Sequence, residues 1–393
     1  MNTPLSRDQF PVVERYRYFD HAGVAPIPRV GAEAVQWWID RTLSKGKVDY
    51  DELEVRQDAA RAAAAALMGV PTNDVAFVKN TTEGIGFVAS GVDWSPGDRV
   101  VVPDLEFPSN LYPWLALRER GVRVDLVRPS GDSGALPIEA FATCLDGGPP
   151  PKVVAVSWVH YGHGWRTDIA ALARLCHDAG ALLCVDAIQG VGILPAELAE
   201  WDVDFAMAGG HKWLLGPEGT GVLYVAERVR DRLRPLEPGW ASVAHRAEWE
   251  NAELVWDDSA RRFEGGTFNM VGTMALGASL QLLLDAGIPN VWAHVDALCD
   301  HLVAELQAVD GARVRSDRSA AGRSGIVSFD IEGESPEATA ARLNASRFVC
   351  GARAGGVRIA PHGYNTAEEI DLLVESVAAA DQKDRQAERH PSP

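Results

Sequence analysis

Cysteine is scarce in this chain, and the few cysteines present form no recognisable pattern. There are five in 393 residues, an odd number, and none belongs to a CxxC pair. A disulfide framework needs paired cysteines and a structural zinc site needs closely spaced ones, so we expect neither a disulfide scaffold nor a metal site. This usage favours a reducing compartment. The five are Cys144, Cys176, Cys184, Cys299 and Cys350.

Long apolar runs and a basic leader are also missing. No stretch reaches the length of uninterrupted apolar residues that a membrane span needs. The N-terminus lacks the basic start and following apolar run of a signal peptide. We therefore expect a cytoplasmic protein.

Basic residues are outnumbered by acidic ones. The chain has 37 Lys and Arg against 55 Asp and Glu, a formal net charge of -18. An acidic protein repels nucleic acid and anionic membranes, so we expect neither as a partner. A small-molecule substrate fits better, and an anionic one would need a local cluster of basic residues.

Apolar strands alternate with helices between residues 75 and 225, and no internal repeat is visible. Several strands, among them VVAVSWV, ALLCV and GVLYV, are almost wholly apolar, which is typical of strands buried on both faces of a sheet. The alternation predicts an α/β fold with a mainly parallel sheet. The predicted strands are 75–78, 99–102, 122–127, 153–159, 181–185, 205–208 and 221–225, and the predicted helices are 52–68, 82–92, 110–120 and 168–179.

The pattern changes after about residue 270, where two long helical stretches lead into short strands and further helices. This predicts a smaller C-terminal α+β domain. The first thirty residues are Pro-rich and irregular. The predicted elements of the small domain are helices 273–286 and 291–309, strand 325–330, helix 336–343, two short strands and helix 367–380. The predicted units are an N-terminal segment 1–20 that packs with the small domain, a large domain 21–268, a small domain 269–380 and a flexible tail 381–393.

Lys212 is the most informative single residue. It follows a short apolar strand and two glycines in AMAGGHKWLLGPEG. Lysines are ordinarily solvated, but an amine among apolar neighbours has a lowered pKa and can form an imine with an aldehyde. The glycines would let the backbone approach a phosphate, and His211 could donate to it. Taken alone, the motif fits a catalytic lysine and an ordinary glycine-rich loop equally well.

Asp186 ends an apolar strand in LLCVDAIQG, 26 residues before Lys212. It could simply cap a turn, as aspartates after strands often do. It could also face the pyridinium nitrogen of pyridoxal phosphate (PLP) and keep that nitrogen protonated, which makes the ring an electron sink. Gln189, three residues on, could then donate to the phenolic oxygen of the ring.

Two further motifs follow strand ends. Thr81 and Thr82 in VKNTTEGIG stand where a strand meets a helix, where they could hold a phosphate or simply cap the helix. Phe107, before Pro108 in LEFPSNLYPW, could stack on a cofactor ring or belong to the core. Ligands of open parallel sheets bind outside the carboxyl ends of the strands, so all four motifs are expected to meet there.

Together these motifs resemble the class V aminotransferase family of fold-type I PLP enzymes. That family includes cysteine desulfurases, selenocysteine lyases, kynureninase and isopenicillin N epimerase-like enzymes. The resemblance runs from YFDHAGVAPIP at residue 18 to PHGYNTAEEIDLL near residue 373, and it is most specific at GGHKW, VDAIQ, NTTE and RFEGGT. It implies PLP as the cofactor and a large PLP-binding domain with a seven-stranded sheet beside a smaller α+β domain.

By this resemblance Lys212 is the Schiff-base lysine. Asp186 pairs with the pyridine nitrogen and Gln189 contacts the phenolic oxygen. Phe107 replaces the His that cysteine desulfurases stack on the ring, because FPSN looks like the kynureninase form of this segment.

The resemblance also implies a phosphate site and a shared active site. Thr82 and His211 bind the phosphate, helped by Thr81 and Gly210. Thr267 in RFEGGT would reach the phosphate of the neighbouring subunit, which implies a homodimer.

The substrate-binding residues follow in the same way. Arg358 in GGVRIAPHGYNT matches the arginine that holds the substrate α-carboxylate, a role for which the guanidinium fork is suited. A surface salt bridge is the alternative for this residue. His21 and Arg353 are the other candidates for substrate contact.

Two departures from the cysteine desulfurases stand out. Cys350 lies only eight residues before Arg358 in an expected strand, where a cysteine is usually a small buried hydrophobe, so we do not expect a persulfide. SWVHYGHGWRTD has His160, Tyr161 and His163 where desulfurases have a shorter polar segment with Asn. Tyr161 is expected beside the ring, and His160 or His163 is either an additional acid/base or structural.

Which bond at Cα breaks is not visible in the sequence. Once the substrate forms an external aldimine, the freed Lys212 amine is the natural base. Proton loss with expulsion of a β-thiolate makes a C–S lyase, and proton return on the other face makes an epimerase. Loss of CO2 makes a decarboxylase or, with O2, a decarboxylating oxidative deaminase.

We favour C–S cleavage by β-elimination on an S-substituted cysteine, in a natural-product (antibiotic) pathway such as a lincosamide-type one. Decarboxylation-dependent oxidative deamination of an S-linked cysteine and amino-acid epimerisation are the alternatives. A non-catalytic PLP-fold binding protein ranks well below these, since the lysine is intact.

Overall fold

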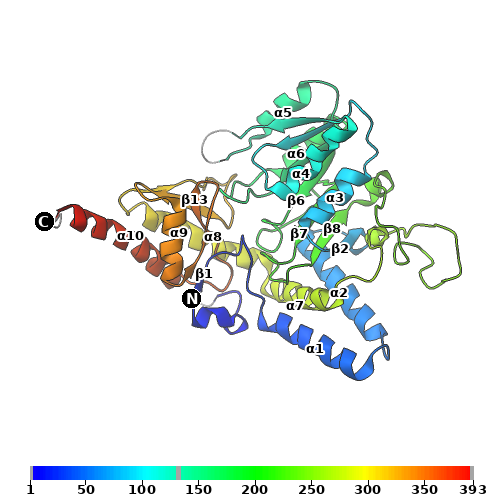
Figure 1. The fold of residues 1–393 in the computed structure, drawn as a ribbon, viewed down its shortest axis with the longest axis horizontal. Coiled ribbons are helices and arrows are strands. Elements are labelled where there is room, and N and C mark those ends of the chain that lie inside the picture. The colour runs from blue at the N-terminus through cyan, green and yellow to red at the C-terminus, as the bar shows by residue number, and fades with distance from the viewer. Residues whose placement is uncertain (1–2, 130–133, 390–393) are drawn as a thin grey trace.

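A seven-stranded sheet forms the centre of the larger part of the molecule (Figure 1). In a computed structural model that describes residues 3–129 and 134–389, the strand order is β2-β8-β7-β6-β5-β3-β4. Neighbouring strands are parallel except at β8, which is antiparallel to both β2 and β7. The predicted mainly parallel sheet is therefore confirmed. Its strands are β2 (Val75–Val78), β3 (Arg99–Pro103), β4 (Arg123–Val127), β5 (Val153–Ser157), β6 (Leu182–Asp186), β7 (Phe205–Gly209) and β8 (Gly221–Val225).

Burial explains the apolar strand sequences. Every residue of β6, β7 and β8 is buried, because helices pack on the sheet and remove both faces of these strands from water. The helices of this domain that contact the sheet directly are α2 (Asp51–Met68), α3 (Thr81–Gly91), α5 (Ile138–Asp146) and α6 (Ile169–Asp178), with α4 (Tyr112–Ala116) packed on α3.

The C-terminal part has its own four-stranded antiparallel sheet, in the order β12-β13-β10-β9. The short β1 (Arg17–Tyr18) pairs in parallel with β11 (Phe348–Val349), so the N-terminal segment lies against this domain. Figure 1 shows that segment in dark blue beside the orange and red elements. The remaining elements are β9 (Ala312–Val314), β10 (Val327–Ile331), β12 (Gly351–Arg353), β13 (Gly356–Ile359), α8 (Ile288–Leu306), α9 (Pro336–Ala345) and α10 (Ala367–Arg389).

Several helices depart from the sequence predictions. No helix is predicted for α1 (Arg29–Lys45) or α5. Leu43 of α1 is 82% exposed, so the apolar residues of that helix do not mark a single buried face. The helix predicted over 110–120 is α4 flanked by 3-10 turns, because prolines interrupt the segment.

The last helix is longer than predicted. It continues through Arg389 instead of ending near residue 380. The segment is charged and has little to bury, which suggested a frayed tail, but Gln, Lys, Arg, Glu and Ala all favour helix. Residues 390–393 of the predicted flexible tail lie outside the described residues.

α7 (Met270–Ala286) leads from the large domain into the small one and packs on α1 and α2. Among the described residues, no single helix is long and apolar enough to cross a membrane. α7 and α8 pass that test only when taken together across a bend of 80°. Both helices bury apolar side chains in the core, including Leu276, Leu283, Val295 and Leu302.

A loop of the large domain, residues 160–166, is held by the segment that precedes β10. The guanidinium of Arg166 donates to Ala320 O at 2.6 Å, and Ser324 Oγ donates to Gly164 O at 2.6 Å. Ser316 Oγ also donates to His163 O at 2.6 Å. These contacts fix the small domain against the loop that follows β5.

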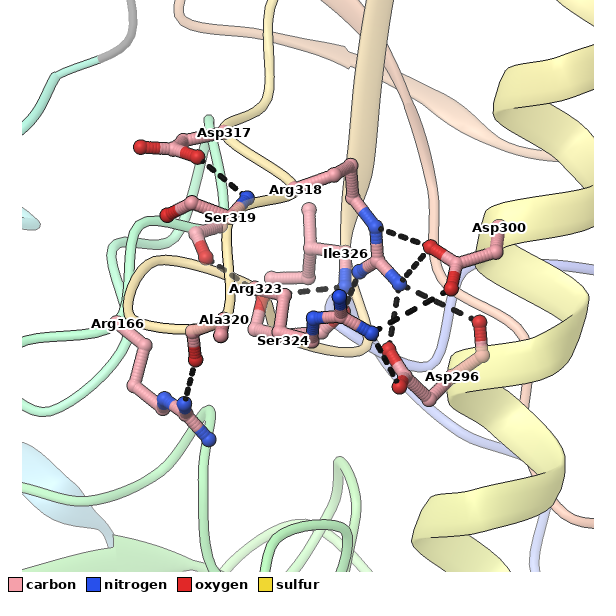
Figure 2. A network of polar contacts seen from close by, with 11 residues as sticks. Arg166, Asp296, Asp300, Asp317, Arg318, Ser319, Ala320, Arg323, Ser324 and Ile326 are labelled. Carbon is pink, nitrogen blue, oxygen red and sulfur yellow. Dashed lines mark hydrogen bonds and ion pairs between the residues drawn. The ribbon is translucent and has the colours of Figure 1, made fainter.

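The same segment is anchored to α8 by an ion-pair network (Figure 2). Arg318 Nη2 lies 2.5 Å from Asp296 Oδ1, and Arg323 Nη1 lies 2.8 Å from Asp296 Oδ2. Asp300 contacts both arginines from one turn further along the helix. Two carboxylates of α8 thus bind Arg318 and Arg323. Figure 2 shows Arg166 on the side of the segment that faces away from α8.

Candidate active site

A cavity of about 270 Å³ lies where β2, β5, β6 and β7 end. Strands that run parallel present their carboxyl ends at one edge, so the residues that follow them converge. The sequence-predicted residues that line this cavity are Thr81, Thr82, Phe107, Tyr161, Asp186, Gln189, His211, Lys212, Arg353 and Arg358.

The amine of Lys212 is buried in this cavity. Lys212 follows β7 in the sequence and stands in a tight turn, in which Leu215 N donates to Lys212 O. Burial lowers the pKa of Lys212 to about 8, and the carboxylate of Asp186 opposes that shift. Nζ lies 5.5 Å from the centroid of the Phe107 ring. About a tenth of this amine is therefore neutral, and nucleophilic, at pH 7.

Steric contact explains why the residue before His211 is a glycine. A Cβ added at Gly210 would lie 2.7 Å from Thr220 Oγ1 and 3.3 Å from Thr220 O, so a larger residue would require Thr220 to move. Gly210 N also donates to Thr220 O. The turn that presents Lys212 therefore depends on this position being glycine.

Asp186 is buried at the end of β6, and its Oδ1 accepts a hydrogen bond from Ile188 N at 3.1 Å. Burial raises the pKa of Asp186 to about 6, while the nearby Lys212 lowers it. The group is thus mainly ionised at neutral pH and lies in the same cavity as Lys212. This arrangement can hold a cationic ring nitrogen.

Glu106 is a second buried carboxylate, which the sequence analysis missed. It accepts hydrogen bonds from Ser157 N at 2.6 Å and from Ser157 Oγ. Burial raises the pKa of Glu106 to about 7, and the negative charge of Asp186 contributes to that increase. Its only signal in the sequence is the position just before Phe107, at a strand end.

The N-terminus of α3 and the turn before Lys212 form one end of the cavity. Asn80 caps α3 by accepting from Glu83 N at 2.9 Å. Thr81 Oγ1 accepts from Gly209 N at 2.9 Å, which ties the helix to β7. Thr82 Oγ1 donates to Ser109 Oγ at 2.7 Å, so Ser109 joins the site without having been predicted. Hydroxyls and a helix N-terminus fit an anionic phosphate.

Phe107 lines the cavity with 40% of its surface exposed, so the alternative assignment to the core is wrong. Its ring meets the edge of the Tyr161 ring at a centroid distance of 5.4 Å. Tyr161 also lines the cavity. The two rings form an aromatic wall near Nζ of Lys212.

Arg358 is almost wholly buried, which rules out the alternative of a surface salt bridge. Its Nη1 donates to Tyr161 O at 2.8 Å and its Nη2 donates to Asp20 Oδ1 at 2.7 Å. Its Nε has no hydrogen-bond partner among the described residues. The guanidinium is therefore held rigidly at the cavity with donors to spare. Asp20, in the YFDHAG segment, was not predicted.

Gln189 is held by two neighbours. Its Nε2 donates to Ala22 O at 3.0 Å, and its Oε1 accepts from Trp213 Nε1 at 2.8 Å. A primary amide has two N–H groups, so one donor remains for a ligand.

Two predicted histidines do not line the cavity. His21 is buried with Nδ1 2.7 Å from Ala360 O and Nε2 2.7 Å from Tyr364 Oη. His160 Nδ1 accepts from two backbone N–H groups, and its Nε2 lies 3.0 Å from Leu105 O. Both nitrogens of each ring already have hydrogen-bond partners, so the roles of His21 in substrate contact and of His160 in catalysis stay predictions.

The burial of His160 also fixes its charge. Desolvation and the neighbouring His163, whose ring stacks on it at 5.1 Å, lower the pKa of His160 to about 4. The imidazole is neutral at physiological pH and donates from Nε2. It therefore serves to shape the 160–164 turn.

No cysteine lines the cavity among the described residues. Cys350 is buried, and burial raises the pKa of its thiol to about 12. A thiol that stays protonated is a poor nucleophile. This placement agrees with the expectation that Cys350 is a buried hydrophobe.

Thr267 does not line the cavity that contains Lys212. It lines two other cavities, of about 280 Å³ and about 410 Å³, neither of which contains Lys212. Within one chain, Thr267 therefore does not meet the residues expected to bind the cofactor.

Comparison with protein families gives one match over most of the chain. A family model described as aminotransferase class-V matches residues 17–373. A probable cysteine desulfurase of Methanothermobacter thermautotrophicus is 31% identical over 398 residues, which cover 96% of this chain and 98% of the relative. YcbU of Bacillus subtilis, an uncharacterized aminotransferase, is 31% identical over 375 residues, with 95% of this chain and 96% of the relative covered.

Solved structures share the fold. The apo cysteine desulfurase of Thermococcus onnurineus NA1 matches with a TM-score of 0.85 at 24% identity, covering 97% of this chain and 98% of that one. The cystine C–S lyase C-DES, in complex with cysteine persulfide, matches with a TM-score of 0.86 at 24% identity, covering 94% and 99%. The two-domain architecture described above is thus the fold of these enzymes.

Proposed function

The chain belongs to the class V aminotransferase family, and on that premise we propose that it is a PLP-dependent lyase that cleaves a C–S bond of an S-substituted cysteine. The observation that carries this proposal is the cavity itself. It contains a buried lysine and a buried aspartate, and no cysteine lines it among the described residues. The net reaction converts an S-substituted cysteine and water into pyruvate, ammonia and a thiol.

The cofactor is pyridoxal phosphate, which when bound supplies an electron sink for the negative charge that develops at the substrate Cα. The donor set of the cavity fits this group. Lys212 would hold it covalently through Nζ, and Asp186 would face its ring nitrogen. Phe107 and Tyr161 offer aromatic surface in the same cavity.

The phosphate would lie at the N-terminus of α3. Thr81 and Thr82 open that helix, and His211 lines the same cavity. Burial lowers the pKa of His211, so this residue would bind as a neutral N–H donor. The first free N–H groups of the helix add further donors.

Lys212 is the group in this cavity that can move a proton at Cα. Burial lowers the pKa of its Nζ to about 8, so the neutral amine is accessible near neutral pH and can accept the Cα proton. The same proton is then available to the departing thiolate. Arg358, held by Asp20 and Tyr161 O, would orient the substrate through its α-carboxylate.

The absence of a cysteine in the cavity lining separates this reaction from sulfur transfer through the protein. A desulfurase needs a thiolate that can reach the substrate sulfur, whereas the Cys350 thiol is buried and protonated. The favoured natural-product pathway stays a prediction, since none of the relatives described above is assigned to one.

Borohydride reduction of the purified holoenzyme, followed by peptide mass spectrometry, should locate the cofactor on Lys212. Incubation with S-alkyl cysteines then separates the reactions. We expect pyruvate and free thiol in equal amounts. Release of CO2 would indicate decarboxylation, and solvent deuterium at Cα of unconsumed substrate would indicate epimerisation. Either result in place of pyruvate would contradict the proposal.

Two variants sharpen this test. Lys212→Ala should abolish pyruvate formation, because both the covalent anchor and the base are removed. Cys350→Ser should keep it within about twofold, because the thiol lies outside the cavity lining. Loss of activity in Cys350→Ser with retained folding would instead favour a desulfurase.

We also propose that the active form is a homodimer with shared sites. Thr267 lines a cavity together with the exposed Trp240 and Trp249, which are 50% and 75% exposed in the single chain. Large exposed aromatic residues of this kind often mark interfaces. Light scattering should give twice the chain mass, and mixing Lys212→Ala with Thr267→Ala subunits should test whether a site draws on both chains.

A further inference from the structure

The basic residues of the cavity lining outnumber the acidic ones. Lys212, Arg353 and Arg358 line it, and Asp186 is the one acidic residue in that lining. Asp20 lies behind Arg358 and pairs with it at 2.7 Å. If Lys212 and Asp186 serve the cofactor and Arg358 serves the α-carboxylate, Arg353 is left over.

Arg353 has no acidic partner of its own. Its Nη1 donates to Ala352 O at 2.7 Å, and no carboxylate in the described part of the chain lies within ion-pairing distance of it. The side chain is exposed at the cavity rim. Its guanidinium therefore keeps most of its donors available to a ligand that enters the cavity.

The β12–β13 hairpin sets Arg353 and Arg358 on the same wall. In this antiparallel pair Gly351 lies opposite Arg358, and Arg353 lies opposite Gly356. Residues opposite one another, or two apart on one strand, share a face. The two arginine side chains are therefore diagonal neighbours on one face of the hairpin.

The tip of the hairpin is fixed against the large domain. A Cβ added at Gly162 would lie 2.4 Å from Cβ of Ala354, so the turn after Arg353 packs directly on the backbone of Gly162. The adjacent Tyr161 O accepts the hydrogen bond from Arg358. One loop thus positions both guanidinium groups relative to the cavity.

We propose that Arg353 binds a second anionic group, carried on the side chain of the substrate. The substrate class is then an S-substituted cysteine whose sulfur substituent ends in a carboxylate. This inference rests on the proposed C–S lyase function, but it concerns recognition and not bond cleavage. A chain with a net charge of -18 repels anions at long range, so two adjacent guanidiniums are the kind of local site that an anionic substrate requires.

The kinetic test compares S-carboxymethylcysteine with S-carbamoylmethylcysteine, which differ in charge but little in size. For the wild-type holoenzyme we expect kcat/KM to favour the acid about 10-fold, the lower end of what a charge-assisted hydrogen bond contributes because the arginine is exposed. Arg353→Gln should bring the ratio close to one, because the acid then loses the partner of its second carboxylate. Arg232→Gln, an exposed arginine outside the cavity lining, should keep the wild-type ratio.

A binding test separates the inference from the reaction. The ligands 3-(carboxymethylthio)propanoate and 3-(carbamoylmethylthio)propanoate lack the amino group and cannot react. Calorimetry should show about 10-fold tighter binding of the diacid to the wild type and equal binding of both ligands to Arg353→Gln. That result supports the inference even if no pyruvate forms from any cysteine derivative. Equal binding of both ligands to the wild type overturns it, even if pyruvate does form.

Discussion

At the scale of single residues, the chemistry of the site rests on ionisable groups removed from water. Lys212, Asp186 and Glu106 are each buried, and in each case desolvation is the largest cause of the shifted pKa. Desolvation favours the uncharged form, so it lowers the pKa of an amine and raises that of an acid. Both changes bring the pKa values closer to neutral pH, where the groups can exchange protons.

The pKa of Lys212 leads to a pH dependence of cofactor attachment. The neutral amine reacts with an aldehyde, and its fraction rises with pH up to the pKa of about 8, instead of the usual 10.5. The rate at which the apoenzyme captures PLP should therefore rise about tenfold per pH unit below pH 8 and level off above it. Stopped-flow absorbance measures this rate. A rate that still rises steeply at pH 9.5 would contradict the lowered pKa, and Lys212→Arg is the control that shows no capture.

Glu106 predicts a second pH effect, on stability. Its pKa is raised from 4.5 to about 7, so the native state binds more protons than the unfolded state between these values. The stability contribution of the protonated carboxyl is full below pH 4.5 and is lost as the pH rises through 7. Glu106→Gln stays neutral throughout, so relative to the wild type it should gain roughly 1 to 3 kcal/mol between pH 5 and pH 8.

Urea unfolding of the apoenzyme at both pH values checks this prediction. Asp186 also has a raised pKa, but it is present in both proteins and its effect largely cancels in the difference. An equal change of stability with pH in the wild type and in Glu106→Gln would show that Glu106 is ionised throughout.

At the scale of elements, helix α3 shows how a secondary structure is placed for a ligand. Its N-terminus must approach the sheet closely to bring Thr81 within hydrogen-bond distance of Gly209 on β7. Gly84 lies one turn into the helix against the same strand. A Cβ there would lie 2.8 Å from Cβ of Met207, whereas a Cβ at Gly86 would meet nothing within 4 Å.

These two glycines form a matched pair within one helix. Gly84→Ala should destabilise the protein by about 1 to 3 kcal/mol, because the added methyl group forces α3 away from β7. Gly86→Ala should instead stabilise it by about 0.5 to 1 kcal/mol, since alanine is the better helix former. Urea unfolding measures both, and PLP affinity should fall only in Gly84→Ala. Similar effects of the two substitutions would mean that the helix is not held in close contact.

At the scale of the whole molecule, the site depends on the two domains keeping a fixed position relative to each other. Arg353 and Arg358 belong to the small domain, and Lys212 and Asp186 belong to the large one. The segment before β10 forms hydrogen bonds with the loop at residues 160–166, and ion pairs anchor this segment to α8 (Figure 2). The geometry of the cavity is therefore linked to an ion-pair network that lies outside the cavity lining.

Asp296 is the more buried carboxylate of that network, with 19% of its side chain exposed against 50% for Asp300. Asp296→Asn leaves Arg318, 11% exposed, without its closest partner and should cost about 1 to 3 kcal/mol. Asp300→Asn should cost less than about 1 kcal/mol. Urea midpoints measure both, and KM should rise only in the Asp296 variant. A larger effect at Asp300 would contradict the anchoring role of Asp296.

The sequence by itself determined the parts of this protein that depend on local pattern. Apolar runs predict the sheet strands to within about two residues, because strands buried on both faces tolerate few polar side chains. Lys212, Asp186, Thr81 and Phe107 each follow a strand, so parallel topology alone predicts that they meet. The family motifs carry the same information.

Only the tertiary structure decided which long-range contacts each side chain makes. His21 and His160 are chemically reactive residue types, but their ring nitrogens already have hydrogen-bond partners. These are the hydroxyl of Tyr364 and backbone groups, most of them distant in sequence. Asp20 meets Arg358 across 338 positions of sequence. Among the described residues, Arg353 donates to Ala352 O but has no carboxylate within ion-pairing distance. Such facts depend on how the whole chain closes on itself, which no local pattern of residues encodes.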